Sequence, residues 1–152
     1  MSNETISKDY ANDMIFELEK AFWDERGKGA RFRLTTLGRD FFRTKCSPKI
    51  QSTEIADMVK TIEGVLKESG IIGGMSVTID GRLLRVRIES CAHRPVEERM
   101  VSMETQPFAC LPANMVVMAV YDKLNRQAEL AEIKLADNAC EVLIVLFDKK
   151  AF

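Results

Sequence analysis

The sequence predicts an α+β domain, in which an antiparallel sheet of about four to five strands carries helices mainly on one face. Two segments, 75–88 and 131–147, each carry two strand patterns on either side of a short turn, as antiparallel hairpins do. Apolar and polar residues alternate in these patterns except in residues 140–147, which are almost all apolar. A helical pattern precedes each of the two segments. Because the first hairpin is apolar on one side and polar on the other, we expect the helices to cover a single face of the sheet.

The chain has 152 residues, the usual size of one domain, and shows no internal repeat. Its hydrophobic fraction of 46% and charged fraction of 30% exclude a disordered tail. We therefore expect a single globular domain over residues 1–152. Within it, residues 1–50 form a helical N-terminal segment, and residues 51–152 form a core with the order helix, hairpin, helix, hairpin.

The N-terminal segment begins with a helix predicted over about residues 10–25, where apolar residues recur at helical spacing. Asn12 or Asp13 is the expected N-cap of this helix. Residues 31–34 alternate in polarity and predict a short strand. Residues 37–45 predict a second short helix with its two phenylalanines directed inward.

The core begins with the clearest amphipathic pattern in the chain, a helix predicted over residues 53–69. Strands 75–79 and 84–88 follow it. Asp80 and Gly81 form the expected two-residue turn between them, since both central positions of such a turn favour positive φ.

The second half of the core repeats the order of helix and hairpin. Residues 96–102 predict one or two helical turns, and Pro112 stands where the first turn of a helix tolerates proline. The helix that follows, 113–125, is apolar on nearly every side, so we expect it to be buried. Strands 131–135 and 140–147 complete the sheet, and the second is apolar on both faces, as in a central strand.

Charge and composition limit the classes of partner. The 22 Lys and Arg against 23 Asp and Glu give a net charge of -1, which argues against a nucleic-acid partner. The basic residues between Arg26 and Lys45 are interpreted as a solvated loop. The longest apolar run, residues 142–147, is too short to span a bilayer, and the polar start carries no signal-peptide pattern. We expect no membrane span and a cytoplasmic location.

Side chains that bind soft metals gather in the middle of the core. Cys91 and His93 follow the end of a predicted strand, and Cys110 lies just before the Pro112 helix. Thiolate and imidazole are the usual ligands of zinc, copper or iron, so Cys91, His93 and Cys110 are the candidate metal ligands, provided that the two loops meet. In the alternative interpretation, the cysteines are small buried hydrophobic residues and His93 lies on the surface.

Cys110 is also the candidate thiol for holding a ligand. The N-terminus of a helix carries unpaired N–H groups and partial positive charge, which lower the pKa of a thiol. We expect Cys110 to be the most reactive of the four cysteines. Its thiolate is expected to bind a metal ion or a haem-like group, or to accept an acyl chain. Asn114 in the same turn is expected to orient a polar group of the ligand, and Met115 and Met118 to line an apolar wall.

The stretch from Leu83 to Phe147 resembles a known family. It contains a strand that leads to Cys91, a short helix, Cys110 directly before a long helix, and a hairpin with Cys140 near its last strand. This order is similar to that of the 4-vinyl reductase-type domain, whose fold also occurs in TRAPP-type trafficking subunits. The resemblance implies a module that binds a small or hydrophobic molecule, often as a sensor or carrier and often as a dimer.

Together these observations predict a sensor or carrier domain that binds a small molecule, a metal or a cofactor. Its pocket is expected between the Pro112 helix and the sheet, with Cys91, His93 and Cys110 at the mouth. The candidate cofactors are a metal ion, a haem-like group and an acyl ligand. Two alternatives are open: a small enzyme with Cys110 as nucleophile, and a homodimeric interaction or assembly module.

Overall fold

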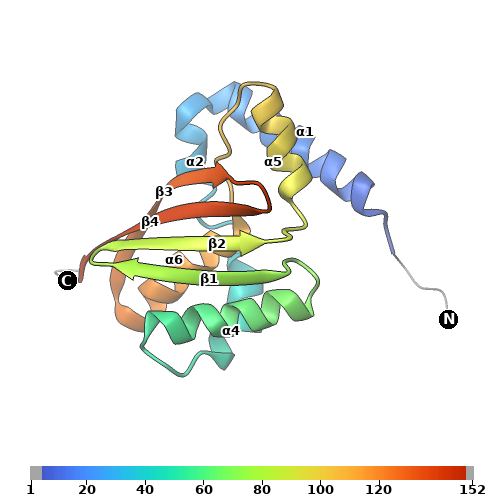
Figure 1. The fold of residues 1–152 in the computed structure, drawn as a ribbon. Coiled ribbons are helices and arrows are strands. Elements are labelled where there is room, and N and C mark those ends of the chain that lie inside the picture. Colours follow the sequence, from blue (N-terminus) through green and yellow to red (C-terminus); the bar gives the residue numbers. More distant parts are fainter. Residues whose placement is uncertain (1–4, 150–152) are drawn as a thin grey trace.

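The computed structural model describes residues 5–149, which form a four-stranded sheet with helices on one side and at one end (Figure 1). The helices are α1 (Lys8–Arg26), α2 (Ala30–Arg33), α3 (Arg39–Phe41), α4 (Ile55–Glu68), α5 (Arg94–Ser102) and α6 (Leu111–Leu124). The strands are β1 (Gly74–Asp80), β2 (Leu83–Glu89), β3 (Arg126–Leu135) and β4 (Ala139–Lys149). Short helical turns at Gly27–Gly29, Phe42–Cys46 and Ser47–Lys49 connect the first helices.

The sheet has the strand order β1-β2-β4-β3, and every neighbouring pair is antiparallel. Each hairpin is formed by consecutive strands, and the pairing of β2 with β4 joins the two hairpins. Asp80 pairs with Leu83, so the first turn consists of Gly81 and Arg82, one residue later than predicted. Moving the turn by one residue shifts the strand pairing by two, so every side chain stays on the predicted face.

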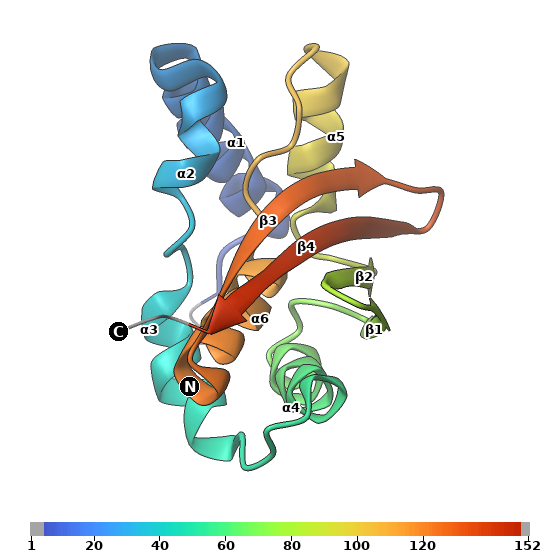
Figure 2. The same cartoon turned by 90° about the vertical axis from the view of Figure 1, so that its left-hand side faces the viewer.

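Helices α4 and α6 pack against one face of the sheet (Figure 2). Alternate side chains of β2 and β4 are buried under them: Leu84, Val86, Ile88, Cys140, Val142, Ile144 and Leu146. The opposite face carries exposed residues such as Arg85 and Glu141. The predicted α+β class, with helices mainly on one face of an antiparallel sheet, is confirmed.

Helix α6 is buried on most of its surface, as its apolar composition predicts. Pro112 lies in its first turn, where a proline removes no helical hydrogen bond. The buried residues of α6 are Pro112, Ala113, Asn114, Met115, Val116, Ala119 and Val120. No helix within residues 5–149 has the length and apolar character that crossing a membrane requires.

A second hydrophobic cluster holds α1, α2 and α5 together at one end of the sheet (Figures 1 and 2). Its buried members are Phe16, Ala30, Val96, Met100, Phe108 and Ala109. The rings of Trp23 and Phe108 lie 5.4 Å apart, a distance typical of stabilising aromatic pairs. Arg99 places its guanidinium 3.8 Å from the centre of the Phe16 ring. This cluster lies beside the main core as a separate body of packed side chains.

Two hydrogen-bonded ties fix the start of α5 between the sheet and α1. The Arg94 guanidinium donates to the carbonyl oxygens of Ala136 and Ala139 at the second hairpin turn, at 2.5 and 2.8 Å. On the other side, the Asn12 side-chain amide donates to the carbonyl oxygen of Ala92 at 3.2 Å. The segment that links β2 to α5 is therefore held from both sides.

Two predictions for the N-terminal segment are wrong. The predicted strand over residues 31–34 is instead helical, as α2. A strand there has no neighbouring strand to pair with, whereas a helical turn satisfies its backbone groups internally. The N-cap of α1 is Ser7, whose hydroxyl accepts a hydrogen bond from the backbone N–H of Tyr10 at 3.0 Å. Asn12 lies inside the helix and is buried against α5.

Candidate ligand-binding site

A cavity of about 490 Å³ lies at the junction of the two hydrophobic clusters. It is lined by Ile15, Leu18, Glu19, Phe22, Leu34, Leu37, Ile88, Cys91, His93, Glu97, Ala109, Cys110, Leu111, Pro112, Ile133 and Cys140. Its volume falls in the range of roughly 300–1,000 Å³ that is typical of small-molecule sites. Hydrocarbon and sulfur form most of the wall, and two carboxyl groups and one imidazole interrupt it.

The cavity opens between α1 and the turn that follows α2. Leu18 on α1 is 67% exposed and Leu37 is 43% exposed, and both also line the cavity. The turn is tied to α6 by Asn114, whose side-chain amide donates to the carbonyl oxygens of Leu34 and Leu37 at 2.9 and 3.2 Å. The mouth therefore has an apolar rim on a firmly held segment.

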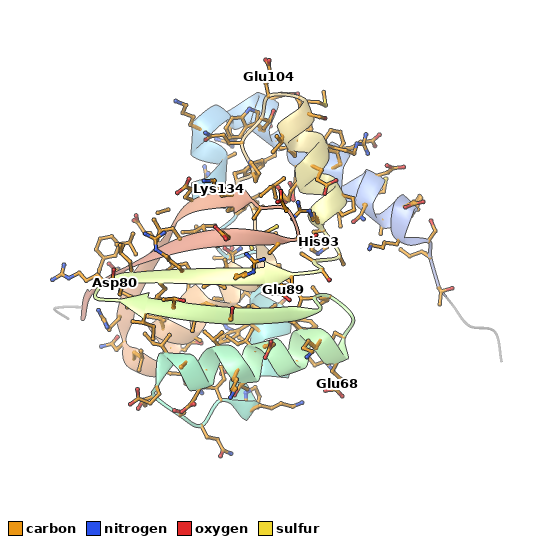
Figure 3. The ribbon with its side chains drawn as sticks, viewed as in Figure 1. Glu68, Asp80, Glu89, His93, Glu104 and Lys134 are labelled. Carbon is orange, nitrogen blue, oxygen red and sulfur yellow. The ribbon has the colours of Figure 1, made fainter. Side chains whose placement is uncertain are left out.

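The structure brings the three predicted metal ligands into one wall. Cys91, His93 and Cys110 all line the cavity. Figure 3 shows His93 where the chain leaves β2 below α5, at the end of the sheet opposite the turn marked by Asp80. The backbone N–H of His93 donates to the Cys91 sulfur at 3.4 Å. The two loops therefore meet, as the sequence argument required.

These side chains share a wall without forming a recognisable metal centre. Within the described residues 5–149, no group of three or more His, Cys, Asp or Glu side chains is placed to hold a metal ion. All four cysteines are free. Burial raises the pKa of the Cys91 thiol, and it raises that of Cys140 to about 11. Thiols must lose their proton to bind a metal, so this burial opposes metal binding.

The prediction of an activated Cys110 thiol is wrong. Cys110 is the N-cap of α6, and the backbone N–H of Ala113 lowers the pKa of the thiol, as expected at a helix start. Desolvation by burial is the larger effect, however, and holds the pKa well above its usual range. Negative charge at Cys91 and Glu97, once these groups ionise at higher pH, acts in the same direction. A thiol that stays protonated at neutral pH is a poor nucleophile.

The other predicted ligand contacts lie outside this cavity. Asn114 is buried and uses its amide to hold the turn at the mouth. Met115 is fully buried in the main core, and Met118 lines a separate surface depression. The expectation that these methionines line the wall is corrected, because only Leu111 and Pro112 of α6 reach the cavity.

Two carboxyl groups in the wall were missed by the sequence analysis. Glu97 on α5 is only 6% exposed, and Glu19 on α1 is partly buried. One oxygen of each, Oε2, is buried without a hydrogen-bond partner among the described residues, and so is Nδ1 of His93. Buried polar atoms are nearly always paired in proteins, so these three atoms call for a partner that the described residues do not supply. We call Glu19, His93 and Glu97 the polar patch.

Burial also changes the ionisation of the polar patch. Desolvation, together with the negative charge of Glu19, raises the pKa of Glu97 to about 9. Desolvation raises the pKa of Glu19 to about 7. Desolvation and the positive charge of Lys8 lower the pKa of His93. At pH 7, Glu97 is therefore a neutral acid and His93 a neutral imidazole, while Glu19 keeps its proton to a higher pH than an ordinary glutamate.

The sequence contains one signal for these carboxyl groups. Glu19 stands three residues after Phe16 and three before Phe22, and Glu97 stands three residues before Met100. Residues three or four apart share a helix face, so both carboxyl groups lie on the buried stripe of their helices. A charged residue on such a stripe indicates a buried carboxyl group.

Comparison of the chain with protein-family models, with curated proteins and with solved structures finds no match. The fold and the site define an α+β domain with an apolar cavity and a buried polar patch.

Proposed function

We propose that this protein is a sensor or carrier domain that takes a small, mostly apolar molecule into the cavity between α1, α5 and the sheet. The observation that carries the proposal is the combination of a 490 Å³ apolar cavity with three unpaired buried polar atoms in its wall. Small-molecule sites typically combine a hydrophobic lining with a few convergent polar groups. The resemblance to the 4-vinyl reductase-type domain stays a prediction.

The energetics of the wall favour an occupant with two chemically different parts. An apolar body loses its contact with water against side chains such as Ile88 and Ile133, at roughly 25 cal/mol per Å² of apolar surface buried. Each unpaired buried polar atom of the polar patch costs about 1–3 kcal/mol. A ligand that pairs with these atoms recovers part of that cost when it binds. A purely hydrocarbon ligand gains from the apolar burial but cannot form hydrogen bonds with the polar patch, so it recovers none of this cost.

A dye titration tests the proposal. Nile red, a neutral apolar fluorophore, is titrated into the wild-type protein and into Ile133→Trp, which places an indole in the cavity. The matched control is Leu135→Trp, two residues along the same face of β3 but outside the cavity lining. Saturable one-site binding is expected for wild type and control, with at least tenfold weaker binding by Ile133→Trp. Equal affinities for all three proteins, or no binding, contradict the proposal.

A substitution at the mouth of the cavity provides a second test that does not depend on the correct folding of Ile133→Trp. Leu37 is 43% exposed, so Leu37→Trp narrows the entrance without disturbing the core. Slower association of Nile red in stopped-flow fluorescence is expected. An unchanged association rate places the entrance elsewhere and contradicts the assignment of the mouth.

A second candidate function, self-association into a homodimer, is favoured by the outer face of α1. Tyr10, Met14 and Leu18 follow one another at intervals of four residues and are 58%, 43% and 67% exposed. An apolar stripe of this kind on a helix indicates a contact surface. Sedimentation velocity of the wild type and Met14→Glu tests this: a dimer that the substitution dissociates is expected. A monomer at all concentrations contradicts it.

A further inference from the structure

We propose that the ligand ends in a primary amine, which the polar patch binds as an ammonium ion between Glu19 and Glu97 while the hydrocarbon part fills the cavity. This inference rests on the proposed function, because it assumes that the cavity binds a small molecule. It adds the chemical class of the ligand.

Charge is the first argument. The polar patch contains two carboxyl groups from different helices, Glu19 on α1 and Glu97 on α5. None of the described residues that line the cavity is a lysine or an arginine. Buried carboxylates are stable only when a counter-charge or a proton accompanies them. Among the described residues of this wall the protein supplies no cation, so a cationic ligand group completes the site. An anionic ligand group would instead lie beside two carboxyl groups and repel them when they are ionised.

Hydrogen-bond stoichiometry is the second argument. A primary ammonium group has three N–H donors and no acceptor. The polar patch offers three atoms that lack a partner among the described residues: Oε2 of Glu19, Oε2 of Glu97 and Nδ1 of His93. With its proton on Nε2, the neutral imidazole accepts at Nδ1. The donor count of the ligand therefore equals the acceptor count of the wall, whereas a hydroxyl group can donate to only one of the three atoms.

The carboxyl groups can present their oxygens to the cavity. Glu97 is 6% exposed and lines the cavity, so it contacts a ligand there but very little bulk solvent. The terminal torsion of a glutamate is broad and roughly two-fold, so rotation of the carboxyl group brings either oxygen forward at small cost. Burial makes each contact stronger than on the surface, because the effective dielectric constant is lower.

Release of a proton on binding makes the affinity for the amine depend on pH. Glu97 is protonated in the empty protein near pH 7. Binding of an ammonium ion then converts the carboxyl group to a carboxylate, and its proton goes to solvent. The affinity for the amine therefore rises about tenfold per pH unit from pH 7 towards pH 9, where the free amine is still charged. Besides Glu19, the titratable groups around Glu97 are His93 directly before α5, Lys8 on α1 and the thiols of Cys91, Cys110 and Cys140. Burial raises the pKa of each of these thiols above its ordinary value.

Three ligands with one hydrocarbon chain test the inference: n-octylamine, n-octanol and octanoate. Each is titrated by Nile red displacement at pH 7 and pH 8 against wild type, Glu97→Gln and the exposed control Glu17→Gln. In wild type and control, octylamine is expected to bind at least tenfold more tightly than octanol at pH 8. Its affinity is expected to rise about tenfold between the two pH values, with no change for octanol. Glu97→Gln weakens both effects and leaves octanol binding intact, and Glu19→Gln, a second variant, also reduces the preference for the amine.

The outcomes separate the two proposals. If octanol or octanoate binds as tightly as octylamine, or if Glu97→Gln leaves the amine preference undiminished, the amine assignment is overturned and the apolar cavity stands. If none of the three ligands displaces Nile red, or Nile red itself does not bind, both proposals are overturned. Octanol binding by Glu97→Gln shows that the variant is folded and that its cavity is open.

Discussion

Replacing Glu97 by glutamine makes the stability of the fold less dependent on pH. The carboxyl group of Glu97 is 6% exposed, and its pKa is raised from an ordinary 4.5 to about 9. Between these values the folded protein holds a proton that the unfolded chain releases. The contribution of Glu97 to stability is therefore complete below pH 4.5 and falls as the pH rises, until it levels off above pH 9. Glutamine is neutral in both states and has no such loss.

The size of the effect follows from the pKa shift. One pKa unit corresponds to about 1.4 kcal/mol, so the wild-type protein loses about 3 kcal/mol through Glu97 between pH 4.5 and pH 7. The advantage of Glu97→Gln over wild type is expected to grow by about 1.4 kcal/mol for each pH unit from 5 to 8. In a chain of this size that is roughly 3–6 °C in Tm per pH unit. Glu19, with a pKa of about 7, lowers the stability of both proteins over the acid half of this range.

Urea unfolding followed by circular dichroism at pH 5, 6, 7 and 8 measures this difference. The control is Glu17→Gln, an exposed position on α1, whose curve should run parallel to that of the wild type. Parallel curves for Glu97→Gln and wild type would refute the reasoning, because they would show that Glu97 ionises in the folded protein as it does in the unfolded chain.

Three further predictions concern single residues. Arg94→Ala removes two charge-assisted hydrogen bonds to the second hairpin turn and should lower the free energy of unfolding by about 2–4 kcal/mol in urea titrations. Arg94→Lys should recover little of it, because an ammonium lacks the fork geometry of guanidinium; full recovery would contradict this. Asn114→Ala removes two hydrogen bonds from a buried amide to the carbonyl oxygens of Leu34 and Leu37 and should cost about 1–3 kcal/mol, so an unchanged urea midpoint would count against that tie. Cys110 in the native protein should react with iodoacetamide far more slowly at pH 8 than in urea, as measured by peptide mass spectrometry. A native half-point of labelling below about pH 8.5 would show an activated thiol instead.

Periodicity predicted most of the fold because the relevant segments are long and one-sided. The helix predicted over 53–69 appears as Ile55–Glu68, and the hairpin strands appear in their predicted order and orientation. The buried residues of α4 all lie on the stripe that faces the sheet and α6: Met58, Val59, Ile62, Val65 and Leu66. In such elements local pattern and tertiary burial agree, so sequence alone suffices.

The errors fall where tertiary packing decides. Four residues, 31–34, carry too little pattern to distinguish a strand from a helical turn, and the absence of a neighbouring strand decided for helix α2. Ser7 caps the start of α1, whereas the side chain of Asn12 binds the carbonyl oxygen of Ala92, just before α5. In each case a contact between distant segments outweighed a weak local preference.

The sequence predicted where the candidate site lies in the fold, but it did not predict the ionisation of its thiols or the buried carboxyl groups. The clustering of Cys91, His93 and Cys110 follows from strand and helix ends that meet, which sequence spacing suggests. The pKa of Cys110 depends on its burial, which spacing does not reveal. Glu19 and Glu97 resemble ordinary surface carboxylates in a chain with 30% charged residues, and only the packing of α1 against α5 buries them.

The most direct test of the binding cavity is to locate a ligand in it by NMR. With methyl-labelled protein and n-octylamine, nuclear Overhauser effects are expected between the alkyl chain and the methyl groups of Ile88 and Ile133, which line the cavity. None is expected to Ile62 or Ile144, which are buried in the main core away from the cavity lining. Contacts confined to surface methyl groups such as those of Ile6 and Ile79, or no contacts at all, would contradict the account.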